Sequence, residues 1–138
     1  MADLISAIVA LLKADSPVAA LAGERVFGGE LPPDEAKQMP RHALVVVPSG
    51  GPSLTGRSYA EHDSQRLDLF AYGATPSDAA VLLQAGALAL RRARRQVRAG
   101  ILLHSITVAG GFSAGRDPDA AWPRAFQSFQ VLHALTEV

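Results

Sequence analysis

The sequence contains no cysteine among its 138 residues. Disulfide bonds, thiolate zinc sites and cysteine nucleophiles are therefore excluded. It also lacks net charge, because thirteen lysines and arginines balance thirteen aspartates and glutamates. The molecule as a whole therefore has no electrostatic preference for nucleic acid or for an acidic membrane, although charge can still cluster locally.

Long hydrophobic runs are missing as well. The first one, Leu4 to Leu12, is followed at once by Lys13 and Asp15, and about nine apolar residues are too few to span a bilayer. Asp3 stands where a signal peptide carries positive charge. We therefore expect an amphipathic first helix that starts at Asp3 and ends near Asp15, no membrane association, and synthesis in the cytoplasm.

Motifs for catalysis, metal binding or cofactor binding are also absent. The four histidines follow no metal-site spacing, no nucleophile elbow is present, and the paired glycines lack the ending of a phosphate-binding loop. His104 and His133 fall in two predicted strands that could pair, but a third metal ligand is lacking. We expect histidines with structural roles, no cofactor, no metal and no enzymatic activity.

What the sequence does contain is ordinary for one folded domain covering residues 1–138. Its apolar content of 49% and charged content of 19% are typical of a globular chain. The clearest local pattern is the alternation from Gln65 to Tyr72, which predicts a strand with one buried face. Thr75, Pro76 and Asp78 then supply a helix N-cap, a proline at the first helical position and an acid in the first turn.

The remaining elements follow from similar patterns. We expect a helix from Pro76 to about Val97 with a buried stripe including Leu82, Leu83 and Leu90, closed by Ala99-Gly100. Strands are predicted at Arg25–Phe27, His42–Val47, Ser58–Tyr72, Ile101–Val108 and Arg124–Glu137. The predicted class is α+β: a mostly antiparallel sheet of four to five strands, with one long helix and the N-terminal helix packed on it, and a long hairpin extension.

Two stretches are predicted to be long loops, residues 49–57 and 113–123. Their glycine, proline and serine content is typical of loops, and their length exceeds the usual connection of about four to six residues. We expect the first to be a flexible hairpin tip that contacts a neighbouring molecule. It comprises Ser49, Gly50, Gly51, Pro52, Ser53, Leu54, Thr55, Gly56 and Arg57.

Five arginines near the end of the long helix form the strongest charge cluster: Arg91, Arg92, Arg94, Arg95 and Arg98. Cations at a helix C-terminus complement its dipole, which accounts for two or three of them. The others either are solvated or meet an acidic surface or a phosphate backbone. Because no aromatic residues are interleaved with them, sequence-specific reading of nucleic acid is disfavoured.

Trp122 is the single tryptophan and precedes the last predicted strand. It either closes the core from the edge of the sheet or, if exposed, anchors an interface. The sequence alone leaves both interpretations open.

Nearly the whole chain resembles the tail-completion (tail-terminator, or tail-to-head joining) proteins of long-tailed bacteriophages, prophages and gene transfer agents. The likeness lies in the joint order of several patterns: LISAIVALLKADSPVAALAGERVFGG, LPP before HALVVV, AEHDSQRLDLFAYGATPSDA, LLHSITVAGG, RDPDAAWPR and FQSFQVL.

This resemblance implies a structural virion protein at the head-proximal end of the tail. The expected form is a homo-oligomeric, hexameric ring that ends the tail tube and joins it to the head connector. The implied partners are further copies of the chain, the tail tube protein and a head–tail adaptor, with DNA passing through the ring without sequence-specific binding. The alternative is a small nucleic-acid- or ligand-binding module that uses the arginine-rich helix end.

The family marks no catalytic residues, so contacts between copies are inferred from charge. We expect the arginine cluster of one copy to face acidic residues in or beside loops of the next copy, with Trp122 as a further contact. The acidic candidates are Glu61, Asp63, Asp117 and Asp119.

Overall fold

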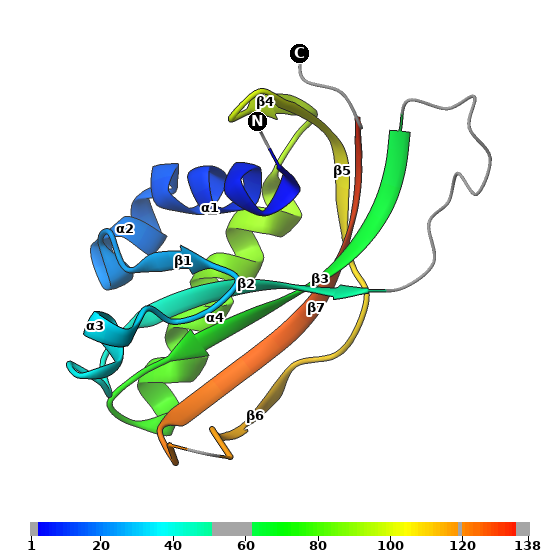
Figure 1. The fold of residues 1–138 in the computed structure, drawn as a ribbon. Helices are drawn as coiled ribbons and strands as arrows, with labels where there is room; N and C mark the ends of the chain where they lie inside the picture. The colour runs from blue at the N-terminus through cyan, green and yellow to red at the C-terminus, as the bar shows by residue number, and fades with distance from the viewer. Residues whose placement is uncertain (1–2, 51–61, 119, 135–138) are drawn as a thin grey trace.

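The computed structural model describes residues 3–50, 62–118 and 120–134. Within these ranges the chain forms four helices and seven strands (Figure 1). Their order is α1 (Leu4–Ala14), α2 (Ser16–Ala22), β1 (Val26–Gly28), α3 (Pro33–Ala36), β2 (Ala43–Gly50), β3 (His62–Tyr72), α4 (Pro76–Arg92), β4 (Gln96–Arg98), β5 (Ile101–Val108), β6 (Ser113–Arg116) and β7 (Pro123–Ala134).

The strands form a single curled sheet in the order β1-β2-β3-β7-β5-β4. Only β1 and β2 are parallel, and every other pairing is antiparallel. β3 and β7 pair along their whole described length, from His62 opposite Ala134 to Tyr72 opposite Arg124. On its other side β7 pairs with β5 over one part of its length and with β6 over another. The two shorter strands β5 and β6 therefore share this side of β7.

Helices α1, α2 and α4 cover one face of the sheet and close the hydrophobic core (Figure 1). Side chains alternate along β3, so that Leu67 and Leu69 enter this core whereas Asp68 and Phe70 lie on the opposite face. The long helix α4 contributes Leu82, Leu83 and Leu90, all fully buried. The predicted buried stripe of this helix is therefore confirmed.

The N-terminal prediction is also confirmed. The Asp3 carboxylate accepts a hydrogen bond from the Ser6 backbone N–H at 2.7 Å and caps the N-terminus of α1. The helix ends at Ala14, with Asp15 as its C-cap. Helix α1 lies close against the sheet, since a Cβ built on Gly28 would come within 2.7 Å of Ile5 Cγ2. Glycine at position 28 thus permits the contact between α1 and β1.

The turn between β3 and α4 forms as the sequence predicts. Thr75 Oγ1 accepts a hydrogen bond from the Asp78 N–H at 3.1 Å, and Pro76 begins the helix. Gly73 is packed against the first turn of α4, where a Cβ would lie 2.5 Å from the Ala79 nitrogen. This junction fixes how the long helix leaves the sheet.

Other predictions need correction. The sheet has seven strands rather than four to five, and the described part of the chain has four helices. α4 ends at Arg92 and not near Val97, because the chain turns into β4, which pairs with β5. The predicted loop 113–123 contains β6, held by its hydrogen bonds to β7. Finally, β2 does not stop at Val47 but runs on to Gly50, with an irregularity after Pro48.

No single helix in the described ranges is long and apolar enough to cross a membrane. The pair α1 and α2 passes the length and composition criteria together, but the two helices meet at a bend of 89°.

Candidate functional site

The arginine cluster lies at the C-terminal end of α4 and in the turn and strand that follow. Arg91 and Arg92 occupy the last helical turn, where positive charge complements the helix dipole. Arg94 and Arg95 lie beyond the C-cap Ala93 and are exposed. These two arginines are therefore not explained by the helix dipole.

A hollow of about 380 Å³ lies beside this end of α4, bounded by the α1–α2 junction and by β4. Its lining includes the apolar side chains of Leu11 and Leu88 and the charged side chains of Arg92, Arg94, Arg98 and Asp15. Leu88 is 43% exposed although it is a large apolar residue. The hollow thus joins an apolar surface to a surplus of positive charge.

The polar contacts around the hollow leave part of this charge unpaired. Asp15 accepts a hydrogen bond from the Val18 N–H at 3.3 Å and so caps α2. Gln96 donates to the Arg94 carbonyl at 2.9 Å and accepts from Arg98 Nε at 2.7 Å, which orders the turn after α4. In the described part of the chain, Arg92 and Arg94 form no ion pair.

A second charged surface lies on the connection between β1 and β2, away from β4 (Figure 1). Glu30 and Asp34 are exposed there and flank Leu31, Pro32 and Pro33. Neither carboxylate has an ion-pair partner among the residues the structure describes. This connection spans residues 29–42, and its first part presents two free acids.

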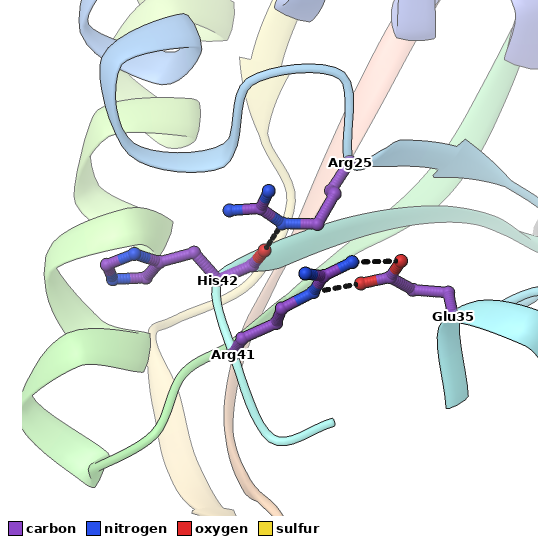
Figure 2. A network of polar contacts seen from close by, with 4 residues as sticks. All are labelled: Arg25, Glu35, Arg41 and His42. Carbon is purple, nitrogen blue, oxygen red and sulfur yellow. Dashed lines mark hydrogen bonds and ion pairs between the residues drawn. The ribbon is translucent and has the colours of Figure 1, made fainter. Parts of the chain in front are cut away.

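The same connection is held in place by the polar network in Figure 2. Arg41 donates from Nε to Glu35 Oε1 at 2.7 Å and from Nη2 to Glu35 Oε2 at 2.8 Å. Arg25 Nε donates to the His42 carbonyl at 2.7 Å and ties the start of β1 to the residue before β2. The connection that carries the free acids Glu30 and Asp34 is therefore ordered by these contacts.

The electrostatics of this network follow from its geometry. The hydrogen bonds from Arg41 lower the pKa of the Glu35 carboxyl below its ordinary value of 4.5; burial opposes this shift, and the charges of Arg41 and Arg25 reinforce it. The hydrogen bond to Glu35 likewise raises the pKa of the Arg41 guanidinium. Both groups are thus held in their charged forms.

Aromatic side chains gather on the face of the sheet opposite α4. The Phe70 and Phe126 rings lie 5.4 Å apart between centroids, and Trp122 meets Tyr72 edge-on at 6.2 Å. The Arg124 guanidinium carbon lies 4.8 Å from the Phe70 ring centre. Half-buried Trp122 therefore packs against Tyr72 on the face opposite the hydrophobic core.

The four acidic residues predicted to meet the arginines fall in different situations. Asp117 is ion-paired with Arg124 at 3.4 Å and accepts a hydrogen bond from the Ala120 N–H at 2.9 Å. Asp63 lies in β3, opposite His133. Glu61 and Asp119 lie outside the described residues, as does the predicted loop from Gly51 to Arg57. Ser49 and Gly50 belong to β2 and not to a loop.

The histidines show no sign of a shared site in the ranges that the structure covers. No group of three or more His, Cys, Asp or Glu residues there could hold a metal ion. His133 is buried, with Nδ1 2.9 Å from the Ala134 carbonyl oxygen, and lies opposite Leu103 in the sheet. The site that the described residues form is a pair of charged surfaces.

The arginines could be predicted from the sequence, whereas the hollow and the role of the acids Glu30 and Asp34 were not predicted. The hollow depends on the packing of the α1–α2 junction beside α4, which no local pattern specifies. A usable signal existed for the acids, because two carboxylates flanking a Leu-Pro-Pro run at a chain reversal point to an exposed, stiff segment.

Comparison with known proteins gives two positive findings. The family model described as Tail completion protein gp17 matches residues 6–134. The fold is similar to that of a chain in the solved structure described as "Virion of native gene transfer agent (GTA) particle". That match has a TM-score of 0.69 and 20% sequence identity, and it covers 95% of this chain and 94% of the other. No curated protein matches the sequence.

Proposed function

Because the chain belongs to the Tail completion protein gp17 family, we propose that it is a structural protein of a phage or gene-transfer-agent tail that forms a ring. The ring ends the tail tube and joins it to the head connector. The match of the family model over residues 6–134 is the observation that carries this proposal. The similarity in fold to a chain of a gene transfer agent virion supports it.

The distribution of charge suits a ring. A closed ring of identical copies needs heterologous contacts, in which one surface of a copy meets a different surface of the next. Arg94 and Arg95 are exposed beyond the end of α4, and the net charge of the chain is zero. Copies can therefore pack closely without the mutual repulsion that a strongly charged chain would suffer.

The proposed partners are further copies of the chain in a hexamer, the tail tube protein and a head–tail adaptor, with DNA passing through the lumen. The β2–β3 hairpin tip, including Gly51 to Arg57, is proposed to contact a neighbouring ring or subunit. Arg91, Arg95 and Trp122 remain proposed contact residues, as do the acids Glu61, Asp63, Asp117 and Asp119. Asp117 would first have to give up its ion pair with Arg124.

The test is deletion of the gene followed by electron microscopy of the lysate. We expect DNA-filled heads and separate tails, and restoration of joined particles when the gene is supplied in trans. Negative-stain images of the purified protein should show rings. Joined, infectious particles in the deletion strain would contradict the proposal.

The alternative function is a small nucleic-acid-binding module that uses the arginine end of α4. It is favoured by one observation, the absence of ion pairs at Arg92 and Arg94 within the described chain. A monomer that binds DNA, with affinity falling steeply as salt rises, would support it. Binding of that kind together with an unaffected head–tail junction would replace the first proposal.

A further inference from the structure

We propose that the hollow at the end of α4 receives the acidic segment Glu30–Asp34 of a second copy of this chain. This inference rests on the proposed ring and adds which two surfaces meet in it. The receiving surface carries Arg92 and Arg94 beside Leu88, and the inserted segment carries two carboxylates beside Leu31 and two prolines.

The free acids Glu30 and Asp34 and most of the free arginines lie on separate surfaces of the described chain. Most charged side chains of the described core are engaged locally, as in the Arg41–Glu35 and Arg124–Asp117 pairs. Of the described arginines without an ion pair, Arg91, Arg92, Arg94 and Arg95 lie around the end of α4, and Arg66 lies apart in β3. The exposed acids Glu30 and Asp34 lie in the β1–β2 connection, which also carries the exposed Lys37. Figure 1 places this connection away from β4, so the two surfaces cannot meet within one molecule. They can meet between molecules, and that contact is heterologous by construction.

The hollow and the acidic segment also match in chemistry. Leu88 is 43% exposed and lines the hollow with Leu11, so the site offers apolar contact as well as positive charge. A segment with an apolar side chain between two carboxylates uses both features. A phosphate backbone would use only the arginines and leave the apolar side chains Leu11 and Leu88 without a partner. The composition of the hollow therefore favours an acidic peptide segment over nucleic acid.

Both surfaces are held by local contacts within one copy. The bidentate Arg41–Glu35 ion pair joins two parts of the connection, and the Arg25–His42 hydrogen bond ties its end to the residue before β1. Prolines at 32 and 33 restrict its backbone. The Gln96 bridge orders the turn that bears Arg94. Two surfaces ordered before contact lose little conformational entropy on association.

The experiment uses two complementary charge-reversal variants of the full chain. One carries Arg92→Glu and Arg94→Glu, and the other carries Glu30→Lys and Asp34→Lys. Each alone places like charges across every contact, so we expect no rings even at about ten times the concentration at which the wild type assembles, as measured by sedimentation velocity and negative stain. Circular dichroism and thermal unfolding should show that both variants remain folded monomers.

An equimolar mixture of the two variants gives the decisive result. In a mixed ring every lysine-bearing segment can meet a glutamate-bearing hollow, and every original acid can meet an original arginine, so alternating copies restore opposite charges at each contact. We expect rings from the mixture but from neither variant alone. Failure of the mixture to assemble while both variants stay folded would overturn the inference.

Control variants separate the specific contact from a general effect of charge. Glu24→Lys and Arg66→Glu make the same changes at exposed positions outside the two surfaces, and rings should persist in both. If only the arginine reversal prevents assembly and the acid reversal has no effect, the hollow receives another protein or nucleic acid and the inference is wrong, although the ring stands. A wild-type chain that stays monomeric at every concentration would overturn the ring itself.

Discussion

Arg41 and Glu35 form a two-point ion pair, with Nε 2.7 Å from Oε1 and Nη2 2.8 Å from Oε2. The pair joins the short helix α3 to the residues that lead into β2 (Figure 2). It therefore closes the connection that presents the free acids Glu30 and Asp34. Because two parallel hydrogen bonds join the guanidinium to the carboxylate, the pair fixes the relative orientation of the two side chains as well as their distance.

The first prediction concerns the pH dependence of this pair. The pKa of Glu35 is lowered in the folded chain from its ordinary value of 4.5, so the pair contributes stability at neutral pH and loses it as the pH falls below about 4.5 and through the folded-state pKa. NMR titration should show Glu35 ionising below its ordinary value. Arg41→Gln should move the Glu35 pKa upward and shrink the loss of stability in that pH window. An unchanged titration would mean that the pair does not persist in solution.

The second prediction concerns the core face of α4. Leu83 is fully buried, whereas Val81 on the same helix is 47% exposed. Leu83→Ala should lower the free energy of unfolding by about 2–5 kcal/mol, because it leaves a cavity as well as losing buried apolar surface. Val81→Ala should change it by less than about 0.5 kcal/mol. Urea unfolding of both variants measures the difference, and equal effects would contradict the orientation of the helix.

The third prediction concerns the turn between β3 and α4. A Cβ at Gly73 would meet backbone and Asp78 atoms at 2.5 to 2.8 Å, and backbone atoms cannot move aside cheaply. Gly73→Ala should destabilise the chain by about 1–3 kcal/mol. Gly115→Ala is the matched control, because a Cβ there meets nothing within 4 Å. Thermal unfolding should separate the two variants clearly, and a Gly73→Ala chain as stable as the control would refute the close approach.

The fourth prediction concerns Tyr72. Burial raises the pKa of its hydroxyl above the ordinary value of 10.0; the hydrogen bond and charge of Arg124 oppose the shift, whereas the charge of Asp117 and a hydrogen bond with it add to the rise. In a Tyr59→Phe background, ultraviolet absorbance should show one tyrosine that ionises late. Arg124→Gln should raise its pKa further. Because the folded-state pKa is the higher one, this group's stabilising contribution is complete below pH 10.0 and falls as the pH rises above it.

Much of the fold could be predicted because its signals are local. Asp3 and Thr75 cap helices with their own side chains. The alternation of polar and apolar residues from Gln65 to Tyr72 indicates which face of β3 is buried. The short strands β4 and β6 could not be predicted in this way. Their sequences, QVR and SAGR, carry no strand periodicity and become strands because β5 and β7 offer them free hydrogen-bonding edges.

The candidate site was predictable only in part for the same reason. A run of arginines is visible in the sequence, but whether Arg92 and Arg94 border a hollow depends on where the α1–α2 junction packs, and that junction lies far earlier in the chain, at Ala14 to Pro17. The helix end itself was misplaced, because alanine and arginine favour a helix through residue 97 and the pairing of β4 with β5 overrides that preference. Tertiary pairing thus decides which arginines face outward.

The last prediction compares two neighbouring arginines that differ in position and not in chemistry. Arg94 lines the hollow, whereas Arg95 is exposed but does not line it. If the hollow is the ring contact, Arg94→Glu should weaken assembly more than Arg95→Glu, although both variants change the charge by the same amount. Individual exposed ion pairs contribute only about 0.2–1 kcal/mol. The effect on assembly is nevertheless measurable, because each contact recurs around the ring.

The midpoint of wild-type assembly should also shift to higher protein concentration as salt rises, since screening shortens the range of these charges to about 8 Å at physiological ionic strength. Equal effects of the two substitutions would mean that the arginines act only through overall charge, and the contact would then have to be sought on another surface.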